Sequence, residues 1–281
     1  MDNKLVDNLV KQIITEDFCL KDITTRTLVH PGHISTARIM ARQNTVICGL
    51  EIAKRIFRRM DQKFLFRSKF TDGKKVKKGD CVLVLKGHTR AILSAERAAL
   101  NILGYLSGIA TLTQQYVQAV KPSKASILDT RKTTPTLRWL ERYAVVCGGG
   151  TNHRDNLSET AMIKDNHLAV SLPSVSITES VQRLKKISRK KIIVEVDNLD
   201  QLAEALLAAP QVILLDNMPV PMIKKAVLIR NRLNKKVLLE ASGGVNLKTV
   251  RAVARTGVER ISVGDLTHSA PSADLSLEMA P

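Results

Sequence analysis

Hydrophobic and polar positions follow two different patterns along this 281-residue chain, and the pattern changes near residue 115. Before the change, apolar residues recur at helical spacing in residues 7–17, 50–60 and 94–120. Residues 37–49 and 81–88 have the composition of strands. The pattern predicts a first part in which helices and short strands form an α+β layer.

Two local features qualify this first part. Residues 71–80 are rich in glycine and charge, which predicts a turn-rich connection between strands. Gly104 and Gly108 lie inside the long helical segment 94–120, and we expect them to loosen that helix because glycine is a poor helix former.

From about residue 120 onward, short apolar runs rich in β-branched residues alternate with helical segments. The runs are 126–129, 161–165, 191–196, 211–216, 236–241 and 260–265. The helical segments are 199–209, 219–233 and 247–256. The last four runs recur at the length of a strand–helix unit, and fully apolar strands are typical of parallel sheets. The second part is therefore predicted to be a parallel α/β sheet or barrel.

Each predicted strand ends in a charged or glycine-containing tip: Asp129, Lys164, Glu195, Asp216, Glu240 and Gly264–Asp265. Parallel strands bring all their carboxyl ends to one face, and α/β barrels build their active sites there. We therefore expect these tips to surround one site.

Cations dominate one part of that predicted face: Arg131, Lys132, Arg138, His153, Arg154, Lys164 and His167. Arginine binds planar carboxylates and phosphates through two parallel hydrogen bonds. The glycines 148–150 would let the backbone approach a ligand closely before His153 and Arg154. This pattern predicts a site for a small polyanion.

The carboxylates Glu195 and Asp216 are expected to be neighbours because they end consecutive strands. Two carboxylates without a cation raise each other's pKa. A magnesium ion shared with substrate phosphates, or a positive charge developing on a substrate, would remove that cost. The alternative is that both residues only cap the helices that follow.

Two glycine turns suggest phosphate binding. Ser242, Gly243 and Gly244 precede the helix expected near Leu247, whose free amides would attract an anion. Gly264 supplies a second turn after the last strand. Phosphate sites after the last strands are a recurring barrel feature.

Composition excludes some protein classes. No apolar run approaches the roughly 20 residues that span a bilayer. The four cysteines form no CxxC pair, which is typical of a reducing cytoplasm, and Cys147 is interpreted as a packed thiol without a base partner. His30, His33 and His268 are interpreted as structural rather than as metal ligands.

The net charge of +18 raises the alternative of a polyanion- or RNA-binding module. Much of the excess lies in two runs, residues 74–78 and 185–191, and neither contains the aromatic residues that stack bases. A solvated surface is the favoured interpretation. The alternative predicts strongly salt-dependent nucleic-acid binding and gives Glu195 and Asp216 no role.

Several long motifs resemble one family. They are "ILDTRKTTPTLRWLERYAVVCGGGTNHR", "MIKDNH", "VEVDN", "ILLDNM", "LEASGGVN" and "SVGDLTHS", preceded by "EDFCLKDITT", "VICGLEIA", "KKGD" and "SAERAALNILGYLSGIAT". Their order is similar to that of the quinolinate phosphoribosyltransferases, and the resemblance covers nearly the whole chain.

The resemblance implies an α/β fold with an N-terminal α/β sandwich, residues 1–115, and an incomplete α/β barrel, residues 116–267. The tail 268–281 is expected to pack on the first domain. The implied enzyme is a cytoplasmic pentosyltransferase of NAD biosynthesis that forms homodimers or hexamers and uses Mg²⁺. It joins quinolinate to 5-phosphoribosyl-1-pyrophosphate and releases nicotinate mononucleotide, pyrophosphate and carbon dioxide, with no nucleic-acid or membrane partner.

The resemblance also implies roles for single residues. Arg131, His153, Arg154 and Lys164 would bind quinolinate, Thr130 would be a further substrate-binding residue, and Arg97 would enter the site from a neighbouring subunit. Lys132, Lys164, Glu195 and Asp216 would be catalytic, with Glu195 and Asp216 near magnesium, directly or indirectly. Ser242, Gly243, Gly244 and Gly264 would bind the 5-phosphate.

The chain departs from the family pattern at a few positions. Ile193 replaces a glutamate, Val146 a basic residue and Thr136 a glycine; Cys19–Leu20 and Asn44 also replace glycine-containing turns. The departures concern metal coordination and affinity more than the reaction. A paralogue of the same fold, of the type associated with molybdenum transport, remains an alternative with another acceptor.

Overall fold

The computed structural model describes residues 2–17, 19–170 and 175–280. The chain divides into two compact units. The first comprises Met1–Leu112, Val146–Gly149 and Ala270–Pro281, and the second Thr113–Val145 and Gly150–Ser269. Within the described residues, no helix combines the length and the apolar character needed to span a bilayer.

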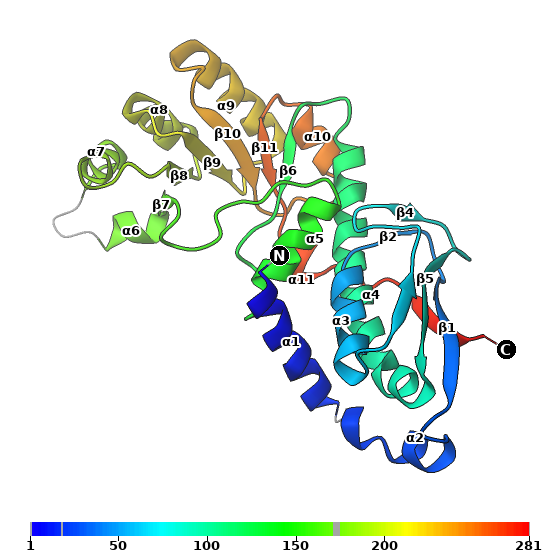
Figure 1. Cartoon of the computed structure of the whole chain (residues 1–281). Helices are drawn as coiled ribbons and strands as arrows, with labels where there is room; N and C mark the ends of the chain where they lie inside the picture. Colours follow the sequence, from blue (N-terminus) through cyan, green and yellow to red (C-terminus); the bar gives the residue numbers. More distant parts are fainter. Residues whose placement is uncertain (1, 18, 171–174, 281) are drawn as a thin grey trace. The chain divides into compact units, whose positions relative to one another are not determined.

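The first unit is built on an antiparallel sheet. In its described part, four strands lie in the order β12-β1-β5-β3, and a two-stranded ladder pairs β2 with β4 (Figure 1). The strands are β1 (Ile34–Ala41), β2 (Thr45–Val46), β3 (Leu65–Arg67), β4 (Lys75–Val76), β5 (Cys81–His88) and β12 (Leu275–Met279). β12 comes from the end of the chain and pairs with β1, Ala37 opposite Met279 and Ala41 opposite Leu275. The tail thus supplies an edge strand to the first unit.

The helices of the first unit include α1 (Asn3–Glu16), η1 (Cys19–Lys21), α2 (Ile23–Leu28) and α3 (Leu50–Met60), and α4 (Thr89–Ala119) begins there. Phe57 of α3 packs against Phe64 with ring centroids 5.6 Å apart, and both rings are buried. This aromatic contact joins α3 to the chain that enters the sheet.

The two glycines of α4 do not loosen it, contrary to the sequence prediction. The helix is continuous through Gly104 and Gly108. A Cβ on Gly104 would lie 2.8 Å from the carbonyl oxygen of Ala273, and one on Gly108 would collide with the carbonyl of Pro271. The glycines instead allow the backbone of residues 271–273 to lie directly on the helix, where Ala273 N donates to Gly104 O at 2.9 Å.

The second unit contains the predicted parallel sheet. Its described strands lie in the order β6-β11-β10-β9-β8-β7, all parallel (Figure 1). They are β6 (Ser126–Leu128), β7 (Ala161–Ile163), β8 (Ile192–Val196), β9 (Val212–Asp216), β10 (Leu238–Ser242) and β11 (Arg260–Ser262). All six predicted strands therefore form.

The strand order is that of a barrel with a gap. The first strand, β6, pairs with the last, β11, as closure of a barrel requires, whereas β6 and β7 are the two edges of the sheet. An isolated parallel bridge between Leu128 and Thr151 lies beside β6 at this gap. The predicted fold class, an α/β protein with an incomplete barrel, is confirmed.

Helices α7 (Ile177–Ile187), α8 (Leu199–Ala208) and α10 (Val250–Ala254) pack on the sheet, and α9 (Val220–Leu233) packs against α8 and α10. The other described helices of this part of the chain are α5 (Arg138–Cys147), α6 (Asp165–Ala169) and α11 (Asp265–His268). Figure 1 shows α7, α8 and α9 side by side along the sheet. Leu202 and Ala205 of α8 and Ile213 and Leu215 of β9 are fully buried, which places a core between helices and strands. This core fixes the strands in place, and with them the carboxyl ends at which a site can form.

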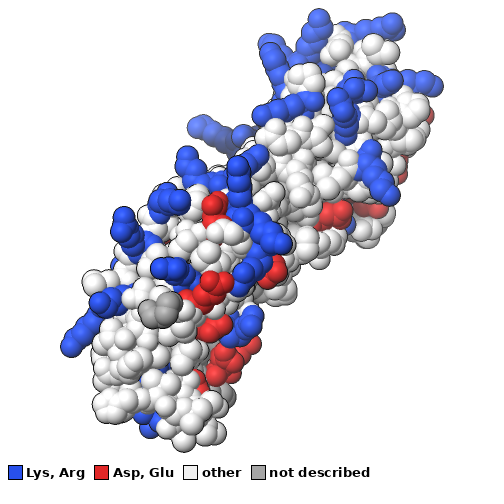
Figure 2. All heavy atoms as spheres, turned by 90° about the vertical axis from the view of Figure 1, so that its right-hand side faces the viewer, with Lys and Arg blue, Asp and Glu red and all other residues white. Residues whose placement is uncertain are grey.

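The excess positive charge lies on the surface. The lysines of the runs 74–78 and 185–191 are exposed, and Figure 2 shows Lys and Arg side chains scattered over one face with acidic groups among them. This distribution is that of a solvated surface.

Candidate active site

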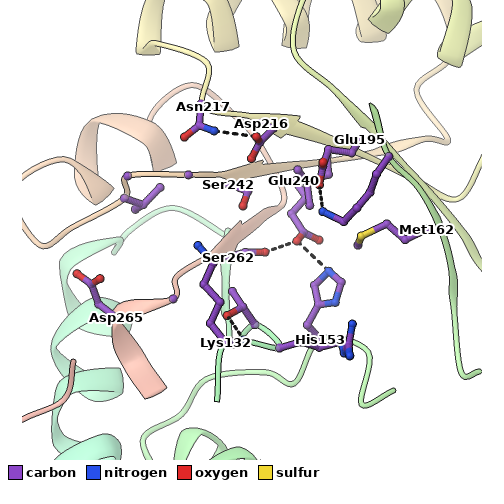
Figure 3. Close-up of a pocket in the computed structure, with 18 of the residues that line it drawn as sticks. Lys132, His153, Met162, Glu195, Asp216, Asn217, Glu240, Ser242, Ser262 and Asp265 are labelled. Carbon is purple, nitrogen blue, oxygen red and sulfur yellow. Dashed lines mark hydrogen bonds and ion pairs between the residues drawn. The ribbon is translucent and has the colours of Figure 1, made fainter. Parts of the chain in front are cut away.

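A cavity of about 780 Å³ opens at the carboxyl ends of the parallel strands. Every wall belongs to the second unit (Figure 3). Of the predicted site residues, twelve line it: Thr130, Arg131, Lys132, His153, Arg154, Lys164, Glu195, Asp216, Ser242, Gly243, Gly244 and Gly264. The strand tips therefore converge as the sequence pattern indicated.

Arg131 and Arg154 give one wall of the cavity a positive character. Burial, and then the nearby Arg131, lower the pKa of Arg154, while Glu195 acts in the opposite direction. The Arg154 guanidinium is held by the carbonyl oxygen of Thr160 at 3.0 Å and the sulfur of Met162 at 3.3 Å. Two neighbouring guanidinium groups form a place where a bound anion is favourable.

Lys164 compensates one of the two neighbouring carboxylates. Its Nζ lies 2.6 Å from Glu195 Oε2, and both side chains are partly exposed to the cavity. Glu195 and Asp216 belong to the adjacent strands β8 and β9, as predicted. The sequence suggested a magnesium ion or a positive charge on a substrate to offset the repulsion between these two carboxylates. In the structure, Lys164 already offsets part of that repulsion.

Glu240 is a fully buried carboxylate at the centre of the site, in the middle of β10 (Figure 3). Its Oε1 lies 3.0 Å from His153 Nε2 and accepts a short hydrogen bond from Ser262, and its Oε2 accepts from Arg260 Nε at 2.7 Å. Burial alone would raise the pKa of Glu240, but His153, Arg260 and Ser262 outweigh it and lower the pKa to about 2. Glu240 is ionised and fixes the His153 ring.

The same interactions select one tautomer of His153. The backbone N–H of Arg154 donates to His153 Nδ1 at 2.8 Å, so the ring proton belongs on Nε2, which faces Glu240. His153 therefore presents its Nε2–H to Glu240 at the cavity wall.

Asp129, the tip of β6, lies directly behind this wall and is fully buried. Its Oδ1 accepts from His153 N at 2.6 Å and lies 3.7 Å from Arg142 Nη1. Burial raises the pKa of Asp129 to about 6, although the hydrogen bond from His153 and the charge of Arg142 oppose the rise. Asp129 positions the loop that carries His153 and Arg154.

Glycine turns form another part of the cavity lining. Gly243 has φ +88°, and a Cβ there would collide with the side chain of Asn217 and lie 2.9 Å from its backbone nitrogen. Asn217 in turn donates to Asp216 Oδ2 at 2.7 Å (Figure 3). A Cβ on Gly264 would lie 2.8 Å from His268 Nε2, so a larger residue there would require the His268 ring to move. Position 243 requires glycine because of both its positive φ and the backbone of Asn217.

Two of the predicted cations, Arg138 and His167, are not among the residues that line the cavity. Arg97, which is expected to act from a neighbouring subunit, belongs to the first unit and is exposed on α4. Arg138 donates to Thr133 Oγ1 at 2.9 Å and to Asp155 O at 3.2 Å, so it holds the loop that follows β6. His167 Nδ1 accepts from Lys164 N at 3.0 Å at the start of α6.

The predicted helix at Leu247 begins at Val250 instead. Asn246 forms a turn in which its side-chain oxygen accepts from Lys248 N at 3.0 Å and from Thr249 N at 3.2 Å. Ser242–Gly244 therefore face the cavity as a loop, separated from the helix.

Further residues of the cavity were not proposed as site residues from the sequence: Met162, Leu214, Asn217, Glu240, Val245, Asn246, Ser262, Asp265 and His268. Glu240 was predicted only as a strand tip; it lies level with Glu195 two strands away, with Leu214 of β9 between them. His268 had been interpreted as structural; its Nδ1 lies 2.6 Å from Ser269 Oγ.

The structure shows the surroundings of three residues that depart from the family pattern. Ile193 is buried with Val212 and Leu214 against Met162, an apolar floor beside the cavity. Thr136 has φ +68°, a conformation that a β-branched residue rarely adopts and that explains glycine as the usual residue. Val146 is half exposed.

A cavity lined by cations, carboxylates and glycines at the carboxyl ends of an incomplete parallel barrel is typical of an α/β-barrel enzyme. Residues 22–107 match the N-terminal domain and residues 109–278 the C-terminal domain of quinolinate phosphoribosyl transferase. The chain therefore belongs to the quinolinate phosphoribosyltransferase family.

Individual relatives agree with this assignment. The chain is 40% identical over 263 residues to nicotinate-nucleotide pyrophosphorylase (carboxylating) of Mycobacterium leprae, covering 92% of this chain and 91% of that protein. A mitochondrial quinolinate phosphoribosyltransferase (decarboxylating) of Nicotiana tabacum is 36% identical over 96% of this chain and 81% of its own length. The crystal structure of nicotinate-nucleotide pyrophosphorylase from Francisella tularensis has a TM-score of 0.93 at 37% identity, covering 100% of this chain and 98% of that one.

Proposed function

We propose that this protein transfers the phosphoribosyl group of 5-phosphoribosyl-1-pyrophosphate to quinolinate, with loss of carbon dioxide, in NAD biosynthesis. The observation that carries the proposal is the convergence of Arg131, Arg154 and Lys164 with Glu195 and Asp216 in one cavity. The family relatives bear names for this reaction in its two directions, carboxylating and decarboxylating.

The cationic wall suits an acceptor with two carboxylates. Arg131 lies close enough to Arg154 to lower the pKa of Arg154, and Lys164 adds a third cation at the tip of β7. Guanidinium groups bind carboxylates through paired, charge-assisted hydrogen bonds worth about 1.5–3 kcal/mol each. A pyridine with adjacent carboxylates matches this wall better than one with a single carboxylate.

The glycine wall suits the phosphorylated donor. Gly243 and Gly264 let the backbone approach a phosphate where a side chain would collide. Ser242 adds a hydroxyl, and Lys132 lies next to Gly264, its Cδ 3.6 Å from the position of a Cβ there. We assign the 5-phosphate to this wall and the pyrophosphate to the side of Lys132.

The residues present fit a magnesium ion. Mg²⁺ prefers carboxylate oxygens and keeps water and phosphate ligands. Lys164 compensates Glu195, so we assign Asp216 as the nearer carboxylate and Glu195 as an indirect one. Magnesium, when bound, supplies positive charge to the pyrophosphate oxygens.

The chemistry follows from the charges of the cavity. Departure of pyrophosphate leaves positive charge on the ribosyl carbon, which Glu195 and Asp216 stabilise in a preorganised site. The pyridine nitrogen then bonds to that carbon, and the ring becomes cationic. The ring draws electrons from the bond to the 2-carboxylate, carbon dioxide leaves, and the ring carbon takes a proton from solvent. The protein mainly aligns two anions that would otherwise repel each other.

Two further features belong to this proposal. Arg97 is exposed on α4, and we assign it to the active site of a neighbouring subunit in a homo-oligomer. We also infer a cytoplasmic location, in line with the free thiols of Cys19, Cys48, Cys81 and Cys147.

The test is an assay of the purified protein with quinolinate, phosphoribosyl pyrophosphate and Mg²⁺. We expect nicotinate mononucleotide, pyrophosphate and carbon dioxide in equal amounts, measured by chromatography and by release of labelled carbon dioxide. Arg131→Ala should reduce turnover by at least about 100-fold because an acceptor carboxylate loses its charged partner.

Nicotinate in place of quinolinate controls for acceptor choice. Product from nicotinate but not from quinolinate would contradict the proposal and favour a paralogue with another acceptor. Full activity of a folded Arg131→Ala protein would contradict the role of that arginine.

A further inference from the structure

Three possible metal ligands come together in the first unit, away from the residues that line the active-site cavity. The thiols of Cys48 and Cys147 and the carboxylate of Asp72 place their ligand atoms within 4.8 Å of one another. Cys48 is fully buried, and Cys147 and Asp72 are partly buried. The proposed reaction uses none of the three.

The backbone fixes these residues from three separate segments. Cys48 lies between β2 and α3, and its N–H donates to the buried Ser107 Oγ at 3.0 Å. Asp72 precedes Gly73, whose N–H donates to Ile47 O at 2.8 Å. A Cβ on Gly73 would lie 3.3 Å from the carbonyl oxygen of Cys147, so the glycine allows a close approach of the third segment. The cluster is thus held by the fold and does not depend on side-chain flexibility.

Backbone amides hold the Asp72 carboxylate in place beside the two thiols. Gly49 N donates to Asp72 Oδ2 at 3.0 Å and Leu50 N to Oδ1 at 3.1 Å, at the N-terminus of the 11-residue helix α3. The carboxylate is therefore fixed within reach of a cation that the two sulfurs could also bind.

We propose that Cys48, Cys147 and Asp72 form a binding site for a zinc-class divalent cation. Zinc takes thiolate and carboxylate ligands in tetrahedral geometry with bonds of about 2.0–2.3 Å, which places ligand atoms roughly 3.3–3.8 Å apart. The observed separations are compatible with that spacing. Three protein ligands leave the fourth position to water.

The ligand set also separates this site from a magnesium site. Thiolates select soft and borderline metals, whereas magnesium requires oxygen ligands. Binding exchanges two thiol protons for one divalent cation, and the protons pass to solvent. No oxidant is involved, because both sulfurs stay reduced.

Cobalt(II) is a suitable probe because it adopts zinc geometry and gives a charge-transfer absorption band only when thiolates coordinate it. Full-length protein, reduced with a phosphine that does not bind metals, is titrated with Co²⁺ and then with Zn²⁺. We expect the thiolate-to-cobalt band to saturate at one ion per chain and to disappear when Zn²⁺ is added. Ions at Glu195 or Asp216 would give no such band because those ligands are oxygens.

Variants assign the band to its ligands. Cys147→Ser should weaken cobalt binding by about 100-fold or abolish the band. Cys81→Ser is the control, because Cys81 is a partly exposed thiol like Cys147, and this substitution should leave the band unchanged. Asp72→Asn should retain the band at lower affinity. Circular dichroism of each variant verifies folding, and Cys48→Ala provides a second thiol variant if Cys147→Ser is unfolded.

No thiolate band in the reduced wild-type protein would overturn the proposal. A band that persists in folded Cys147→Ser and Cys48→Ala proteins would do the same. If a thiol assay of the phosphine-treated wild-type protein finds neither Cys48 nor Cys147 as a thiol, and no band appears, the two residues form a disulfide. That result also contradicts a metal site. Since nicotinate mononucleotide formation is not the readout, this result is independent of the proposed function.

Discussion

At the scale of single residues, Asp129 connects the stability of the barrel to pH. Its pKa is raised by burial to about 6 from an ordinary 3.8. An acid whose pKa is higher in the folded state contributes stability below the unfolded pKa, and that contribution is lost as the pH rises through the folded value. Ionised Asp129 therefore destabilises the folded protein at neutral pH.

Asp129→Asn should remove this pH dependence. The asparagine oxygen can still accept from His153 N, and the Asn152 amide beside it can turn to accept instead of donating. Between pH 4.5 and 7.5, the free energy of unfolding of the wild type should fall relative to the variant by about 2 kcal/mol. Urea denaturation of both proteins at several pH values measures the difference.

Asp155→Asn is the matched control, because Asp155 is an exposed carboxylate 3.4 Å from Arg142 Nε and Asp129 faces the same arginine. Parallel pH profiles for wild type and Asp129→Asn would show that Asp129 does not titrate in this range.

The pKa of Glu240, lowered to about 2, affects stability only at lower pH: its contribution is present above about 4.5 and is lost as the pH falls toward 2.

Some contacts of single residues could not be predicted from the sequence. Lys164 and Glu195 were each placed at a strand tip from the apolar pattern, but their 2.6 Å ion pair depends on β7 lying beside β8. The role of Glu240 depends on Arg260 directly opposite it on β11 and on His153 from a loop far away along the chain. Such contacts arise from tertiary neighbours, which periodicity does not identify.

At the scale of elements, the strands were predictable and the turns less so. Each of the six apolar runs forms a parallel strand because a strand buried on both faces needs a continuous apolar sequence. The start of α10 was misplaced by three residues because Asn246 forms its own side-chain turn before the helix. Glycines in α4 were misread because the chain end that packs on them is remote in sequence.

The turn after β10 provides a test at this scale. Gly243→Ala adds a Cβ that collides with Asn217, whose amide donates to Asp216. The substitution should displace both the proposed phosphate-binding turn and Asp216, and we expect the KM for phosphoribosyl pyrophosphate to rise by at least about 10-fold. Steady-state kinetics with the donor as the varied substrate measures it.

Gly244→Ala separates collision from backbone strain. Gly244 also has a positive φ, +61°, but nothing lies within 4 Å of a Cβ at this position. Only the left-handed strain of about 1–2 kcal/mol remains, so its KM should change much less than that of Gly243→Ala. Equal effects of the two substitutions would mean that contact with Asn217 is not what makes glycine necessary at position 243.

At the scale of the whole molecule, the proposed role of Arg97 predicts that an active site needs two chains. Arg97→Ala and Asp216→Asn proteins should each be inactive alone. If they are mixed and reassembled as random dimers, half of the dimers contain one chain of each kind. When Arg97 acts on the partner's site, such a dimer has one site with both changes and one with neither.

The mixture should therefore regain about a quarter of wild-type activity, because one site in four is intact under random pairing. A mixture of Lys164→Ala and Asp216→Asn is the matched control: both residues line the cavity of their own chain, so each site keeps one defect and no activity returns. Failure of the Arg97 mixture to recover activity, with mixed dimers demonstrated by mass spectrometry, would contradict the assignment of Arg97 to a neighbouring site. Recovery would explain why an exposed arginine on α4 belongs to the chemistry of a cavity built entirely from the second unit.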